Sequence, residues 1–149
     1  DNTFSEKLIQ NEKNLRLFSN LKDLILMKCK ITNLERLVDF IINNKSISNV
    51  NICNNNIEKI DYFFEKIIFP DKKISSLLNI DMSRNNLIID EGLVDKISKN
   101  KNKFKLSGIK VIDITWSKLD DKNKVPDISS SFIIVKEEPY QKNTFHLLE

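Results

Sequence analysis

Alanine is absent from this chain of 149 residues, and glycine and histidine are almost absent. The only glycines are Gly92 and Gly108, which excludes a glycine-rich loop that could cradle a phosphate. The only histidine is His146, so a Ser-His or Cys-His catalytic pair is not expected, and no Cys/His cluster has zinc-ligand spacing. We therefore expect a protein that is not an enzyme, with no cofactor, no bound metal and no small-molecule substrate.

Cysteines and long apolar runs are also scarce. Cys29 and Cys53 do not form the pattern of a disulfide scaffold, which favours an intracellular, reducing compartment. No apolar run is long enough to span a bilayer, so we expect no membrane contact. The net charge of +3 is too small to predict a nucleic-acid partner on its own. Lys, Asn and Ile are abundant, and this bias lowers the weight of any single Lys or Asn.

One stretch carries a recognisable repeat motif. Residues 77–87 read LLNIDMSRNNL and fit L-x-x-L-x-L-x-x-N-x-L, the pattern of a leucine-rich repeat. Ile80 and Met82 alternate along a short strand, so both point into the core. Asn85 follows where the chain leaves the strand, and its amide can satisfy backbone groups of the neighbouring turn. Stacked repeats would make a ladder of such residues.

The same pattern occurs four times. The matches start at positions 21, 47, 77 and 109, so the intervals are 26, 30 and 32 residues, long enough for a helix in each repeat. Cys29 replaces Asn in the first repeat, as a structural residue, and Ser117 replaces it in the last. The pattern predicts an α/β leucine-rich-repeat arc of the ribonuclease-inhibitor-like kind, with four repeats. We expect parallel concave strands near 24–26, 50–52, 80–82 and 112–114, with convex helices.

The segments between the strands have the period of helices with one buried face. Thr32 and Glu35 suggest a capping box for the first, Pro70 ends the second, and Asp90 caps the third. Phe63 and Phe64 are assigned to packing. The predicted organisation is an N-terminal helical cap over residues 1–20, four repeats over 21–119, and a C-terminal flap and flexible tail over 120–149.

Residues between the core positions of each strand are expected on the concave face. One column holds Ile25, Asn51, Asp81 and Asp113, and another holds Asp23, Asn49, Asn79 and Val111. A third column is formed by Met27, Cys53, Ser83 and Thr115. This mixed polar surface with an apolar corner suits an adaptor or other protein partner better than a phosphate backbone.

The residues just past each strand form a different edge, the rim. Lys28, Lys30, Arg84 and Lys118 share it with Trp116, and cations beside an indole can bind single-stranded RNA. A lysine run between the third and fourth repeats could extend this edge through Lys96, Lys99, Lys101, Lys103 and Lys105. The alternative is that these lysines are ordinary surface residues and that Trp116 covers the core.

Residues 21–119 resemble the leucine-rich-repeat domain of nuclear mRNA export receptors of the TAP type. The resemblance is carried by ISNVNICNNNIEKID (47–61), SLLNIDMSRNNLIIDEGLVDKI (76–97) and KLSGIKVIDI (105–114). It implies a domain that binds RNA and adaptor proteins, acts in mRNA export, and resides in the nucleus and at the nuclear pore. The RNA-recognition, NTF2-like and ubiquitin-associated-like domains of that family are absent here, which is compatible with one domain of a longer protein.

A second class of protein remains open. Leucine-rich-repeat proteins of similar length serve as protein-interaction scaffolds in splicing, in the cytoskeleton or in GTPase regulation. On that interpretation the chain would have no nucleic-acid role. The two classes differ in whether the rim binds RNA.

Overall fold

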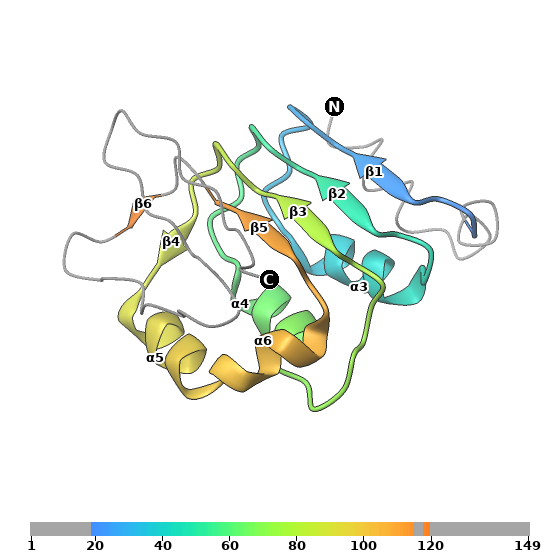
Figure 1. Cartoon of the computed structure of the whole chain (residues 1–149). Helices are drawn as coiled ribbons and strands as arrows, with labels where there is room; N and C mark the ends of the chain where they lie inside the picture. Colours follow the sequence, from blue (N-terminus) through green and yellow to red (C-terminus); the bar gives the residue numbers. More distant parts are fainter. Residues whose placement is uncertain (1–18, 115–117, 120–149) are drawn as a thin grey trace.

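Four short parallel strands form the central sheet of the computed structural model, which describes residues 19–114 and the backbone of residues 118–119 (Figure 1). In sheet order these strands are β1 (Asp23–Ile25), β2 (Asn49–Asn51), β3 (Asn79–Asp81) and β5 (Val111–Asp113). Each begins one residue earlier than predicted. Parallel pairing also runs past the strand ends, since Leu26 N–H donates to Asn51 O at 2.8 Å, so the difference concerns only the boundary.

The register of the sheet follows the motif spacing. Leu24 pairs with Val50, Val50 with Ile80, and Ile80 with Ile112. All four of these central side chains are buried, while their neighbours along each strand are exposed or half-buried. The predicted alternation is therefore confirmed in all four strands. A one-residue slip would have moved the apolar set to the other face.

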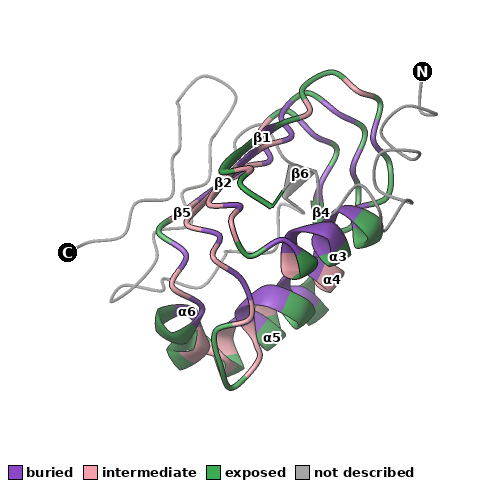
Figure 2. Ribbon diagram, turned by 90° about the vertical axis from the view of Figure 1, so that its right-hand side faces the viewer, coloured by how far each residue is buried: buried purple, intermediate pink, exposed green. Residues whose placement is uncertain are grey.

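The helical segments lie together on one side of this sheet. They are α3 (Glu35–Asn43), α4 (Asp61–Phe63), the π-helical turn η1 (Phe64–Ile68), α5 (Glu91–Lys99) and α6 (Lys101–Ser107). Figure 2 shows the buried sides of α3 and α5 turned inward and their exposed sides turned away. A second, two-stranded parallel sheet pairs β4 (Ile88–Ile89) with β6 (Lys118–Leu119). The fold is thus mixed α/β with a four-stranded parallel sheet.

The core lies between the sheet and the helices. The first two helical segments each bury one apolar face, as their period predicts, and the buried residues are Leu34, Leu37, Val38, Ile41, Ile60, Phe63, Phe64, Ile67 and Ile68. Phe64 packs edge-on against Phe63 at 5.7 Å between ring centroids, and against Phe104 at 6.0 Å. The assignment of Phe63 and Phe64 to packing is therefore confirmed. In α5, Leu93 and Ile97 are buried and Val94 is half-buried.

The two predicted helix caps have different outcomes. Asp90 caps α5, because its Oδ1 accepts from Leu93 N–H at 2.8 Å. The prediction of a capping box at Thr32 and Glu35 is wrong. Leu34 already has helical backbone angles, and Asn33 Oδ1 instead accepts from Glu35 N–H at 2.7 Å. The short Asn side chain bonds two residues ahead in a local turn, which removes the need for the threonine.

The predicted asparagine ladder is present at Asn55 and Asn85, which are both buried. Asn55 Oδ1 accepts from Cys29 N–H and Ile31 N–H of the preceding turn, at 2.9 and 3.1 Å. Asn85 Oδ1 accepts from Ile57 N–H at 3.1 Å in the same way. Each side chain therefore joins its own turn to the preceding one. Cys29 takes the equivalent place in the first turn, where its thiol donates to Met27 O at 3.3 Å.

Helix α6 was not predicted. It places Phe104 in the core and ends at Gly108, whose φ of +75° is the left-handed conformation that favours glycine. Several predictions lie outside the described residues. These are the helical cap apart from residues 19 and 20, the positions of Thr115, Trp116 and Ser117, and the C-terminal flap and tail at 120–149.

Candidate functional site

The first candidate surface is the side of the central sheet that the helices leave uncovered, which we call the inner face. It consists of two columns of strand residues. The sheet register places Ile25, Asn51, Asp81 and Asp113 side by side in one, and Asp23, Asn49, Asn79 and Val111 in the other. Both predicted columns are therefore brought together by the fold.

Side-chain hydrogen bonds order the second column. Asn49 Nδ2 donates to Asp23 Oδ1 at 2.6 Å, and Asn79 Nδ2 donates to Asn49 Oδ1 at 2.7 Å. The three groups form a chain across β1, β2 and β3. Asn49 Nδ2 also donates to Ser48 Oγ at 3.4 Å, whereas Asn79 Nδ2 keeps a second N–H for another acceptor. The column therefore presents polar groups in fixed orientations.

The inner face is hollowed over the middle of the sheet. A shallow cavity of about 320 Å³ is lined by residues of all four strands, including Asn49, Asn51 and Asn79. Leu24, Val50 and Ile80 also line it, although their side chains are buried in the core on the other side of the sheet. This shape suits a side chain or a short segment of a partner.

The two ends of the inner face differ in chemistry. At the β1 end, Ile25 is 66% exposed and Met27 is 43% exposed. At the other end, Asp81 and Asp113 are register partners on β3 and β5. Asp81 Oδ1 accepts from Ser83 N–H at 2.9 Å, and Asn51 Oδ1 accepts from Cys53 N–H at 3.1 Å. The amide of Asn51 therefore accepts the same backbone hydrogen bond as the carboxylate of Asp81, so either side chain can stabilise the turn that follows the strand.

Cys53 was predicted as a surface contact in the third column, and this is wrong, because it is only 8% exposed. Its carbonyl accepts from Asn55 Nδ2 of the same turn and from Lys28 N–H of the preceding turn, both at 3.3 Å, so the two turns are joined. Burial raises the pKa of the Cys53 thiol, and Asp81 raises it further. Met27 belongs to the outermost described turn and stays exposed, and Ser83 is half-buried.

The second candidate surface is the rim, formed by the turns that follow β1, β2 and β3. Lys28, Asn54 and Arg84 occupy equivalent places in these turns, with φ of 55°, 57° and 55°. Lys28 N–H donates to Cys53 O and Asn54 N–H donates to Ser83 O, so the turns are stacked in order. The side chains of Lys28, Lys30 and Arg84 are exposed. The structure thus brings these three cations to one edge.

The remaining predicted RNA contacts have different outcomes. The backbone of Lys118 pairs with Ile88 in the small sheet, and Trp116 lies outside the described residues. The lysine run belongs to α5 and α6, which Figures 1 and 2 place away from the turns of the rim. It does not extend the edge formed by Lys28, Lys30 and Arg84.

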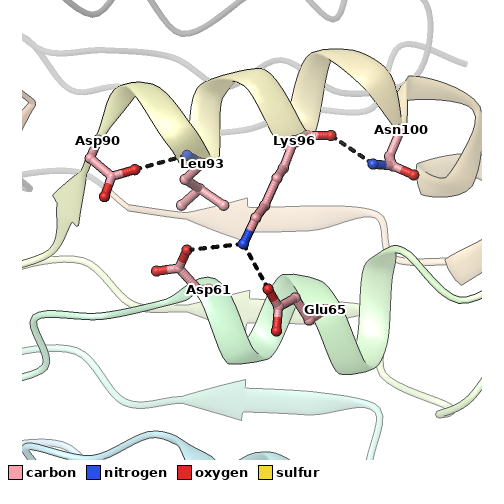
Figure 3. Close-up of polar contacts among 6 residues, drawn as sticks. All are labelled: Asp61, Glu65, Asp90, Leu93, Lys96 and Asn100. Carbon is pink, nitrogen blue, oxygen red and sulfur yellow. Dashed lines mark hydrogen bonds and ion pairs between the residues drawn. The ribbon is translucent and has the colours of Figure 1, made fainter.

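Two lysines of the run also have acidic neighbours. Lys96 Nζ lies 2.8 Å from Glu65 Oε1 and 3.9 Å from Asp61 Oδ1, between α5 and the α4–η1 segment (Figure 3). The hydrogen bond to Glu65 raises the pKa of Lys96. Lys103 pairs with Asp71. Lys99, Lys101 and Lys105 are exposed. A ligand of Lys96 or Lys103 would have to displace a carboxylate.

Sequence reasoning missed an acidic hollow on the flank of the molecule. This cavity of about 610 Å³ lies beside the beginnings of the helices, and its lining includes Glu35, Glu58, Asp61, Glu65 and Asp90. The sequence does contain a sign of it, because several of these acidic residues stand at the start of a predicted helix, where acidic side chains are favoured. Their convergence depends on how the helices stack, which the motif alone does not show.

Comparisons with protein-family models, with curated proteins and with solved structures find no match to this chain. Among the described residues, no group of His, Cys, Asp and Glu side chains has the arrangement of a metal site. The same residues contain no helix long and apolar enough to cross a bilayer.

Proposed function

We propose that residues 21–119 form a leucine-rich-repeat module. The support is the recurrence of one geometry along the chain. Strand residues pair at intervals that match the motif, and Asn55 and Asn85 make equivalent bonds to the preceding turn. Every connection between successive strands of the sheet passes through a helical segment on the same side (Figure 1).

We infer that this module is a non-enzymatic binding domain and that its inner face binds another protein. The observation that carries this proposal is the open sheet surface with an ordered polar column, Asp23–Asn49–Asn79, beside the exposed Ile25 and Met27. Protein interfaces combine such apolar contacts with oriented hydrogen-bonding groups. The resemblance to TAP-type mRNA export receptors supports an adaptor protein as partner and the nucleus and nuclear pore as the place of action.

A selection from a random-peptide phage library on the folded chain tests this function. The selected peptides are synthesised, and amide hydrogen exchange with and without peptide shows which backbone groups they protect. We expect protection in β1, β2 and β3. The matched variants are Ile25→Ser on the inner face and Leu106→Ser on α6, because both replace an exposed apolar side chain. Weaker binding is expected only for Ile25→Ser, and peptides that protect only the helices would overturn the proposal.

A second candidate function is RNA binding on the rim. The observation that favours it is the fixed spacing of Lys28 and Arg84, which are exposed in equivalent turns on either side of the Asn54 turn. Cations on one edge attract a phosphate backbone, and a contacted strand would release counterions. The scaffold alternative predicts that this edge binds no RNA.

Fluorescence anisotropy with a labelled single-stranded RNA distinguishes these alternatives. The variant Lys28→Glu/Lys30→Glu/Arg84→Glu is compared with Lys59→Glu/Lys72→Glu/Lys110→Glu, which makes the same charge change at exposed positions outside the rim. Binding that weakens with salt and is lost only in the first variant supports the RNA role. The absence of binding at low salt, or equal loss in both variants, contradicts it.

A further inference from the structure

Given the protein-binding role proposed for the inner face, we propose the chemistry of its partner. The partner segment carries an apolar side chain that packs on Ile25 and Met27 and a Lys or Arg side chain that pairs with Asp81 and Asp113. The two side chains are separated by the width of the sheet. This inference rests on the proposed function and specifies which segments the face accepts.

The apolar end of the inner face is defined by two exposed side chains on one edge. Ile25 and Met27 are more exposed than the inner-face residues of the other strands, which are half-buried. Covering exposed apolar surface is favourable because it removes that surface from water. Met27 also adapts to partners of different shape, because its side chain is unbranched and polarisable. An aliphatic or aromatic side chain of the partner fits this end.

The acidic end is defined by two carboxylates on adjacent strands. Asp81 and Asp113 are register partners, and strands in a sheet lie about 4.8 Å apart. A cation that lies between them can pair with both carboxylates, and hydrogen bonds between ionised groups are among the strongest in proteins. Asp81 and Asp113 both raise the pKa of the nearby Cys53 thiol, while Arg84 and Lys28 lower it. A Lys or Arg side chain therefore complements this end.

The distance between the ends limits the partner further. Ile25 and Asp81 are separated by two strand spacings, about 10 Å, and Ile25 and Asp113 by three, about 14 Å. An extended chain rises about 3.3 Å per residue, so its apolar and basic residues would be three or four positions apart. In a helix the same span corresponds to about seven to nine residues. Between the ends, the hollow with Asn49 and Asn79 receives polar groups of the partner.

The experiment uses the peptides selected from the phage library. We expect an apolar and a basic residue at one of these spacings in the selected sequences. Binding of a synthetic peptide is then measured for the wild type, Asp81→Asn/Asp113→Asn, and the control Glu91→Gln/Asp95→Asn, whose carboxylates are exposed on α5. The inner-face pair should weaken binding about tenfold, which corresponds to one charge-assisted contact, and the control should not.

The substitutions are chosen so that the fold is retained. Asn51 occupies the same column as Asp81 and accepts the equivalent backbone hydrogen bond, so an asparagine at position 81 can keep its turn. An unchanged circular dichroism spectrum checks this. Selected peptides without a basic residue, or equal affinity for both double variants, would overturn the proposed partner chemistry. Peptides that bind outside the inner face would instead overturn the proposed function.

Discussion

Asn55 and Asn85 donate to the same backbone oxygen. Asn55 Nδ2 lies 2.8 Å from Ile52 O, and Asn85 Nδ2 lies 3.0 Å from it, although the two residues belong to successive turns. A carbonyl oxygen has two lone pairs, so one group can satisfy both donors. This shared acceptor links the turn after β2 to the turn after β3.

Replacement of Asn85 by alanine should destabilise the protein more than the same change at its neighbour. Asn85 is 3% exposed and bonds to Ile57 N–H and to the carbonyls of Ile52, Met82 and Ser83. Leaving such buried groups without a partner costs about 1–3 kcal/mol. Asn86 is exposed, and surface changes usually stay within about 0.5 kcal/mol. Urea denaturation of Asn85→Ala and Asn86→Ala compares them, and equal midpoints would mean that the ladder carries no stability.

Glycine should be preferred to alanine at position 84. Arg84 has φ of 55°, where a Cβ atom costs about 1–2 kcal/mol, and glycine avoids this cost. We therefore expect Arg84→Gly to be more stable than Arg84→Ala by about 1 kcal/mol. Both variants remove the same charge, so their difference reports the backbone alone. Thermal unfolding measures it, and a more stable alanine variant would show that this turn does not retain the left-handed conformation.

Phe104 should contribute much of the stability supplied by α6. Its side chain is fully buried, at 6.0 Å from Phe64 and 6.4 Å from Phe69 between ring centroids. Phe104→Ala should cost about 3–5 kcal/mol, because it leaves a cavity that the surrounding helices can fill only in part. Leu106→Ala is the control, since Leu106 is exposed on the same helix. If both variants had similar unfolding free energies, α6 would not pack on the core as described.

The thiol of Cys53 should ionise only at high pH. Its pKa lies above the ordinary value of 9.0 because of burial and the charge of Asp81. In a Cys29→Ser background, the rate of alkylation by iodoacetamide should therefore rise with a midpoint above 9.0. The same chain unfolded in urea provides the reference. Asp81→Asn should lower the midpoint of the folded chain, and a midpoint equal to that in urea would contradict this environment.

The same shift affects stability in a defined direction. The pKa of Cys53 is higher in the folded chain than in the unfolded chain. The contribution of this thiol to the free energy of unfolding is therefore fully present below the unfolded pKa. It is lost as the pH rises through the folded pKa. A Cys53→Ser variant should therefore lose less stability than the parent at alkaline pH.

The strands, the ladder and the buried helix faces could be predicted because each follows from local periodicity. Ile80 and Met82 define an alternating strand, and Asn85 has a role that its spacing specifies. The missed helix shows the limit of this approach. Lys101, Lys103 and Lys105 surround Phe104, so α6 resembles a polar connection, although it carries one of the most buried side chains of the core.

The candidate surfaces were predictable only in part. The columns of the inner face follow from strand alternation and register, as Asn49 and Asn79 show. The burial of Cys53 depends on how its turn packs against the preceding turn, to which the bond from Lys28 N–H joins it, and no spacing reveals this. The separation of the lysine run from Lys28 and Arg84 depends on the path of α5 and α6 through space.

The lengthening intervals between paired strand residues indicate where the chain tolerates insertions. From β1 to β5 the register advances without a slip, although the number of residues between successive strands increases. The extra residues are accommodated on the helical side, where α5 and α6 meet at Asn100. An epitope tag or a fluorescent label inserted after Asn100 should therefore leave both candidate surfaces unchanged. Such a labelled chain would report binding from a site that neither partner is expected to contact.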